Sequence, residues 1–136
     1  LAGVLRLRGR PEEAVVAYRR AAQCEPPTPA IRDATVGALI DAGAIDEART
    51  EAERLIREHP DFVPGHNTLA DLRWEYGPGP GSDEDPLQPF IAAADAAPRN
   101  HELQLGLIGF LLEARRWTDA LDRLQALRRA VEHPAL

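Results

Sequence analysis

The sequence predicts an all-α fold built from helix pairs, and three observations support this. Residues 9–26 align with residues 43–60 at a shift of 34, which is the length of one helix–turn–helix repeat. Apolar residues recur at spacings of three and four, as they do along one face of a helix. No stretch alternates between apolar and polar residues, as a strand would. We therefore expect about four antiparallel helix pairs and no sheet.

The repeat places the elements in order. First helices are expected over about 1–8, 30–42, 63–76 and 101–114. Second helices are expected over about 11–24, 46–58, 86–97 and 118–132. Each pair makes one repeat of a single domain, with repeats at about 1–28, 29–62, 63–100 and 101–134. Small residues let the two helices of a pair approach closely: Ala14, Ala48 and Ala120.

Glycine and proline mark the ends of these helices. Gly9 and Gly43 each end a first helix, where the chain needs a left-handed residue. Three prolines fall in first helical turns, where a missing N–H is tolerated: Pro11, Pro29 and Pro86. Three others terminate second helices: Pro26, Pro60 and Pro98.

The third repeat has a longer turn than the others. From Pro60 to Pro98 the interval is 38 residues instead of 34. We place the four extra residues in "YGPGPGSDEDP", between Tyr76 and Pro86. In the fourth repeat, residues 115–117 (Arg-Arg-Trp) take the place of the glycine turn.

Composition and charge suit one domain and limit its partners. The 136 residues carry a net charge of −6, and an acidic chain repels nucleic acid and anionic membrane surfaces. No apolar run approaches the roughly 20 residues that cross a bilayer, and no signal peptide is evident, so we expect a cytoplasmic protein. The single Cys24 excludes an internal disulfide. Because the chain begins at Leu1 and contains no Met, we expect a fragment of a longer protein.

The spacing of small, aromatic and proline residues resembles the tetratricopeptide repeat family over nearly the whole chain. The first repeat matches the family pattern at Gly9, Ala14, Tyr18, Ala21 and Pro26. The other repeats match it in part, the third at Phe90, Ala93 and Pro98 among others. The resemblance implies a right-handed superhelix whose concave groove is lined by first helices and binds a protein or peptide segment.

Carrying the family's groove positions over to this chain gives an acidic set with one tryptophan. Its members are Asp33, Asp41, Asn67, Asp71, Trp74, Glu75, Glu102 and Glu113, with Gly37, Leu105 and Gly109 among them. Such a surface suits a basic segment, through charge pairing and cation–π contact. An exposed tryptophan costs free energy unless something covers it. Either a partner or the loop over 77–85 would cover Trp74, and the sequence leaves both readings open.

The stretch "EHPDFVPGH", Glu58 to His66, contains a His-x-Asp that resembles half of a non-haem iron site. We interpret it as the end of a helix, because Pro60 aligns with Pro26. There His59 complements the helix dipole and Asp61 caps the next helix. An iron site of this kind needs ligands on a rigid β-barrel, and no strands are predicted. We expect neither metal nor cofactor, and we expect three histidines to lie mostly at the surface: His66, His101 and His133.

Catalytic motifs are absent from the sequence. It contains no phosphate-binding loop or nucleophile motif, and Cys24 has no neighbouring His or Lys, so we expect no enzyme activity in this segment. One alternative remains. Repeats three and four also resemble the tetratricopeptide arms that precede iron/2-oxoglutarate oxygenase domains in bacteria. On that reading the segment is a substrate-binding or assembly arm, and the iron ligands lie beyond Leu136.

Overall fold

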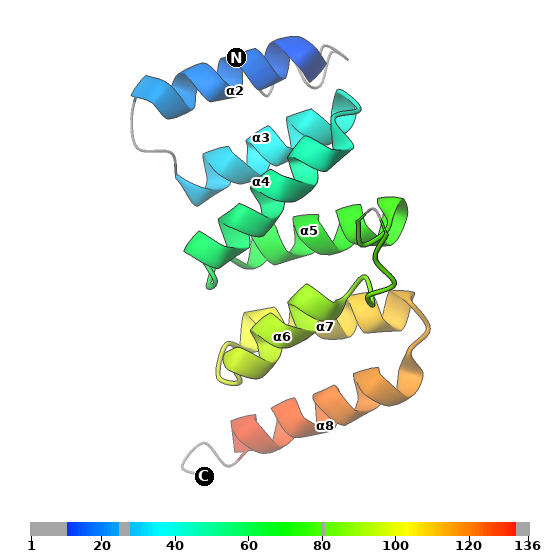
Figure 1. Cartoon of the computed structure of the whole chain (residues 1–136). Helices are drawn as coiled ribbons and strands as arrows, with labels where there is room; N and C mark the ends of the chain where they lie inside the picture. Colours follow the sequence, from blue (N-terminus) through cyan, green and yellow to red (C-terminus); the bar gives the residue numbers. More distant parts are fainter. Residues whose placement is uncertain (1–10, 25–27, 80, 133–136) are drawn as a thin grey trace. The chain divides into compact units, whose positions relative to one another are not determined.

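The computed structural model of the chain describes residues 11–24, 28–79 and 81–132. Over these residues it consists of seven helices and no strand, which confirms the all-α prediction (Figure 1). The helices are α2 (Pro11–Cys24), α3 (Pro29–Asp41), α4 (Ile45–Glu58), α5 (Val63–Tyr76), α6 (Gln88–Ala96), α7 (His101–Glu113) and α8 (Trp117–Glu132). The helix predicted over 1–8, with Gly9, Pro26 and His133, lies outside the described residues.

Helix boundaries agree with the sequence prediction except at α6. The prediction placed Pro86 in the first turn of this helix, but α6 begins at Gln88 and its first-turn proline is Pro89. The backbone carbonyl of Pro86 instead accepts a hydrogen bond from Arg73 at 3.0 Å. Since that contact belongs to the preceding loop, the helix starts two residues later than the repeat alone indicates.

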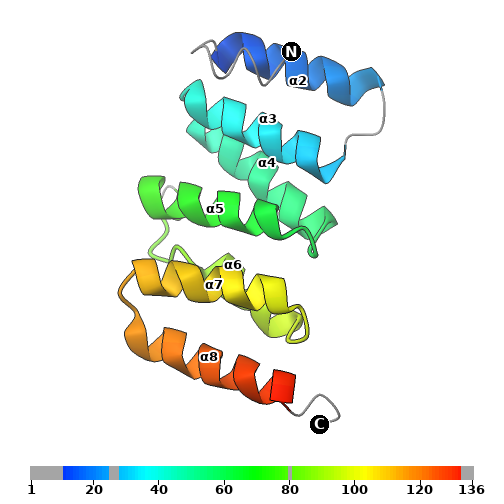
Figure 2. The ribbon, with the colours of Figure 1, turned by 180° about the vertical axis from the view of Figure 1, so that it is seen from behind.

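The described chain divides into two compact units, and the division falls between Pro86 and Leu87. In the first unit α3 packs against α2, α4 and α5, and α4 also packs against α5 (Figure 2). A single cluster of buried apolar side chains joins α2, α3, α4 and α5. Ala14 and Ala48 belong to it and are completely buried, as expected of small residues at close helix contacts.

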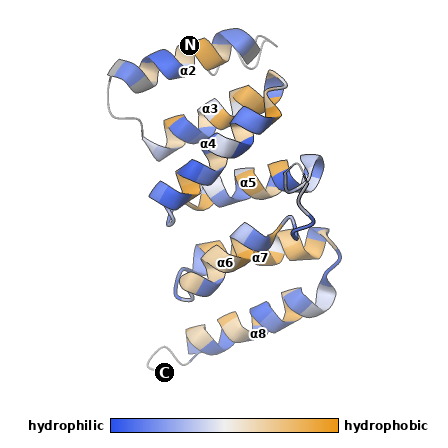
Figure 3. Ribbon diagram, viewed as in Figure 1, coloured by the Kyte–Doolittle hydropathy of each residue, from blue (hydrophilic) through white to orange (hydrophobic). Residues whose placement is uncertain are grey.

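The second unit contains α6, α7 and α8, with α7 packed against both of the others. Helix α7 is coloured largely as hydrophobic in Figure 3, and it buries Leu103, Leu107 and Leu111 completely. The rings of Phe90 on α6 and Phe110 on α7 lie 5.7 Å apart between centroids. The prediction of one domain with repeats at the stated limits stays a prediction.

The turn between the helices of a pair has the same geometry in the second and fourth repeats. Gly43 has a φ of +81° and Arg115 a φ of +59°, so both are left-handed. The next residue, Ala44 or Arg116, donates its N–H to the carbonyl five positions back at 2.9 Å in both cases. This closes the last turn of the first helix in the way typical of a helix C-terminus. The turns lie 72 residues apart, the sum of the predicted intervals of 34 and 38.

Successive pairs are also joined in the same way. His66 Nε2 lies 2.8 Å from the Pro60 carbonyl oxygen, and Gln104 Nε2 donates to the Ala97 carbonyl at 3.1 Å. Positions 66 and 104 are 38 apart, so both side chains serve the end of the preceding second helix. The prediction that His66 lies at the surface is therefore wrong: its exposed fraction is 2 %. The physical reason is that carbonyls at a buried helix end need a donor from outside the helix.

Candidate partner-binding surface

The residues predicted to line a groove fall on three first helices. Asp33 and Asp41 lie on α3, Asn67, Asp71, Trp74 and Glu75 on α5, and Glu102 and Glu113 on α7. Helices α3 and α5 pack against each other, so the structure brings the first six residues onto neighbouring helices. Glu102 and Glu113 belong to the second unit, near the two ends of α7, and both are exposed.

A surface hollow lies between α3 and α5. Its lining residues are Ala30, Asp33, Ala34, Gly37, Ile40, Thr68 and Asp71. Asp33 and Asp71 are the only charged residues in this lining, and most of the others are small. The hollow is therefore acidic and has room for a side chain from outside. Two of the predicted groove residues form it, which sequence analysis located without defining the space between the helices.

Trp74 is the main exposed aromatic residue of α5. Its exposed fraction is 55 %, and that of Tyr76 at the end of the same helix is 45 %. The described part of the loop after α5 thus leaves more than half of the Trp74 side chain open to solvent. Of the two readings left open by the sequence, the reading in which this loop covers Trp74 is the one the exposure disfavours. Asp71 and Glu75 beside it are exposed as well.

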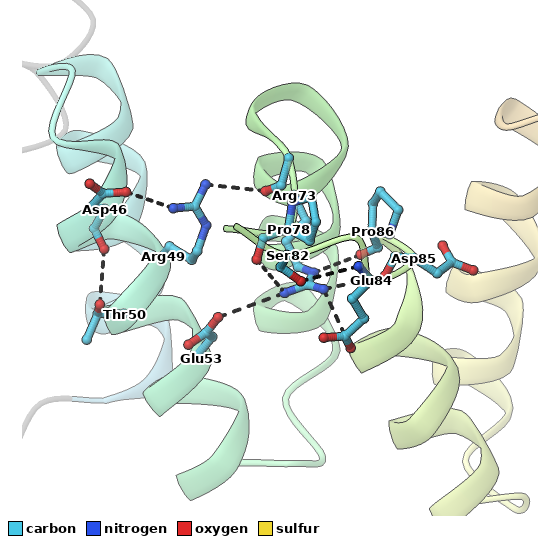
Figure 4. A network of polar contacts seen from close by, with 11 residues as sticks. Asp46, Arg49, Thr50, Glu53, Arg73, Pro78, Ser82, Glu84, Asp85 and Pro86 are labelled. Atoms are coloured by element: carbon cyan, nitrogen blue, oxygen red, sulfur yellow. Dashed lines mark hydrogen bonds and ion pairs between the residues drawn. The ribbon is translucent and has the colours of Figure 1, made fainter. Parts of the chain in front are cut away.

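The loop is held instead by Arg73, the residue before Trp74. Arg73 is 4 % exposed, and three backbone carbonyls accept its hydrogen bonds: Nε to Pro86 at 3.0 Å, Nη1 to Pro78 at 3.2 Å and Nη2 to Asp85 at 3.4 Å (Figure 4). Two carboxylates lie slightly further away, Glu84 at 3.7 Å and Glu53 at 3.9 Å. A single guanidinium therefore holds both ends of the loop.

A second buried arginine supports the same loop. Arg49 on α4 donates through Nη2 to the Gly77 carbonyl at 3.3 Å, and its Nη1 bonds Asp46 at 2.8 Å (Figure 4). Sequence analysis did not single out Arg49 or Arg73. A signal was present, however, because a loop rich in proline has carbonyls but few N–H groups, so its acceptors need donors from elsewhere.

Another hollow, on the side of α2 and α4, is lined by charged residues that pair with one another. Its lining is Arg19, Arg32, Thr35, Leu39, Glu51, Arg54 and Glu58. Glu58 accepts hydrogen bonds from both Arg54 and Arg32, and these bonds, Arg54 first, lower the pKa of its carboxyl group. Arg19 pairs with Glu47. Because each guanidinium already has a carboxylate partner, we assign this hollow to contacts between helices.

The His-x-Asp stretch lies at a helix end. His59 is the C-cap residue of α4, as predicted. Asp61 does not cap α5, contrary to prediction: Phe62 is the N-cap residue, and no side chain bonds to the helix start. His101 is exposed on α7. Among the residues that the structure describes, no group of three or more His, Cys, Asp or Glu side chains is placed to hold a metal ion.

Comparison with known proteins adds no assignment. No protein-family model matches the chain, and no curated protein matches its sequence. In the described part of the chain, no helix is both long and apolar enough to cross a membrane.

Proposed function

We propose that the chain is a protein- or peptide-binding module of the tetratricopeptide kind, without catalysis of its own. On this proposal about four helix pairs form a right-handed superhelix, and first helices line its concave groove. The repeated geometry supports it: the turns at Gly43 and Arg115 match, and so do the helix-end contacts of His66 and Gln104. Stacked repeats of this kind create extended concave binding surfaces.

The observation that supports the proposal best is the exposure of Trp74 beside an acidic hollow. Trp74 is 55 % exposed, and its helix contributes Asp71 to the hollow that Asp33 completes from α3. Aromatic residues that a partner can cover are the usual anchors of protein interfaces. A cationic side chain suits both parts of this surface, since it can pair with the carboxylates and lie against the indole face.

The partner that fits best is therefore a basic segment of protein. Attraction to exposed carboxylates acts over about 8 Å at physiological ionic strength, so binding should weaken as salt is added. It should also lose strength when the indole is removed, by roughly 2 kcal/mol if Trp74 is a true anchor.

A quantitative pull-down with the tagged chain, followed by titration of the recovered partner, tests the proposal. We expect Trp74→Ala, and the pair Asp71→Asn with Glu75→Gln, to weaken binding. Trp117→Ala on α8 is the matched control, because Trp117 is 60 % exposed and lies outside the predicted groove set. Equal binding by wild type and both groove variants, with no response to salt, would show that the groove assignment is wrong.

A further inference from the structure

Helix α7 presents an exposed apolar face that no described element covers. Leu105 is 55 % exposed and Leu112 is 46 % exposed, although the opposite side of the helix is fully buried. The two leucines are seven residues apart, two helical turns or about 10 Å along the axis. Gly109 lies between them and is also exposed. Large apolar side chains on the same helix face, with nothing over them, indicate a contact surface.

Gly109 has no structural reason within the chain itself. It lies inside a helix, where glycine is less stable than alanine because it loses more backbone freedom on folding. It has no positive φ, and a Cβ added to it would meet no atom within 4 Å. A side chain would therefore fit and would stabilise the helix. Glycine at such a position is explained if another molecule approaches the backbone closely.

The four residues around Gly109 form the kind of hole that a facing helix fills. Leu105, Ile108, Gly109 and Leu112 occupy positions i, i+3, i+4 and i+7, which is the arrangement that accepts one side chain in knobs-into-holes packing. Ile108 is 6 % exposed and closes one side of the hole. With glycine in place of a larger residue, the hole is deep enough for a bulky apolar side chain.

The charges of α7 define the partner further. The helix contains no arginine, and its two acidic residues, Glu102 and Glu113, are exposed near its two ends. Both fall within about 40° of Gly109 around the helix axis, on the side away from the leucines, at 100° per residue. A partner that covers the leucines would thus bring its flanking residues close to carboxylates, and basic residues there would pair with them.

We propose that this face of α7, defined by Leu105, Gly109 and Leu112, docks an amphipathic helix that bears a bulky apolar knob flanked by Arg or Lys. The proposal rests on the proposed function, because these residues belong to the predicted groove set. It adds the secondary structure of the partner and the point of closest approach. The partner helix crosses α7 at Gly109, inserts its apolar side chain between the leucines and pairs with Glu102 and Glu113.

Fluorescence anisotropy with designed helical peptides of about 20 residues tests the proposal on the full chain. The first probe has a leucine stripe flanked by arginine, and the second has the same stripe flanked by glutamate. We expect the arginine probe to bind, with an affinity that falls as salt is added, and the glutamate probe to bind about tenfold more weakly or not at all. If wild type binds neither probe, or binds both equally, the proposal is wrong.

Gly109 variants separate binding from folding. We expect Gly109→Ala to melt at a higher temperature than wild type and Gly109→Leu to remain folded, yet Gly109→Leu should weaken the arginine probe about tenfold or more by filling the hole. Glu102→Gln with Glu113→Gln should weaken binding and reduce its salt dependence. Ala92→Leu is the control, since it adds an exposed leucine on α6. Unchanged binding by Gly109→Leu would overturn the proposal.

Two further outcomes distinguish this proposal from the proposed function. If Trp74→Ala loses the natural partner while Gly109→Leu retains it, the groove function stands and the α7 docking site is wrong. If sedimentation shows that the wild-type chain dimerises and that Gly109→Leu is monomeric, the occupant of the face is a second copy of the chain, which also overturns the proposal of a separate basic helix.

Discussion

At the scale of single residues, buried polar side chains decide how one element ends and the next begins. His66 and Gln104 have different chemistry but occupy the same position of successive repeats, and each bonds a carbonyl at the end of the helix before it. The repeat therefore requires a donor at this position and not a particular residue type. Arg73 shows the same principle, since its guanidinium supplies donors to a loop whose prolines supply none.

Replacing Arg73 by Met should destabilise the first unit. The loop carbonyls of Pro78, Asp85 and Pro86 would lose a charged donor, and hydrogen bonds to charged groups contribute about 1.5–3 kcal/mol. Chemical denaturation followed by circular dichroism measures the change in the free energy of unfolding. Arg128→Met on α8 is the matched control: that side chain is 76 % exposed, and its pair with Glu132 should contribute less than about 1 kcal/mol. Equal stability of the two variants would contradict the role given to Arg73.

At the scale of elements, the small residues of second helices set how closely the helices pack. Ala14 on α2 and Ala48 on α4 are completely buried, and both belong to the apolar cluster that also includes Val36 and Leu39 of α3. A larger side chain at either position has no free space to enter. The helices would have to move apart, because protein interiors are closely packed.

Accordingly, Ala14→Leu and Ala48→Leu should each lower the free energy of unfolding by about 1–3 kcal/mol, the usual effect of overpacking. Thermal melting of each variant beside wild type measures this. Ala92→Leu adds the same side chain at an exposed position of α6 and should melt close to wild type. If both buried variants melt like the control, the packing described for α2, α3 and α4 is wrong.

At the scale of the whole molecule, the described helices differ widely in how much of their length is buried. In α5 seven residues are buried, among them His66 and Arg73, whereas α8 has Ala120 as its one buried residue. Local opening costs least where few apolar contacts are lost. Stability in repeat proteins is also summed from each repeat and its neighbours, which favours fraying of weakly buried helices.

Hydrogen exchange should therefore be faster in α8 than in α5. We expect backbone amides around Ala120 and further along α8 to exchange through local opening, and those around Leu69 and Leu72 to exchange only in larger unfolding events. Mass spectrometry of fragments, with unfolded chain as the reference for intrinsic rates, makes the comparison. Similar protection of the two helices would mean that burial does not control local stability here.

The sequence alone determined the number, type and order of the described helices. Glycine at a left-handed turn, proline near helix ends and a period of 34 residues act through local geometry, so they are visible without tertiary contacts. The groove set could also be located, because helical spacing places its members on shared faces. The start of α6 was misplaced, since only the Arg73 contact shows that Pro86 belongs to the loop.

Tertiary structure decided the features that depend on residues distant in the sequence. The burial of His66 and Arg73 follows from carbonyls supplied by other segments, and no local pattern distinguishes them from surface residues. The exposure of Trp74 and the open space beside Gly109 likewise depend on what packs nearby. Periodicity tells which face of a helix a residue is on, but only the positions of neighbouring elements tell whether that face is covered.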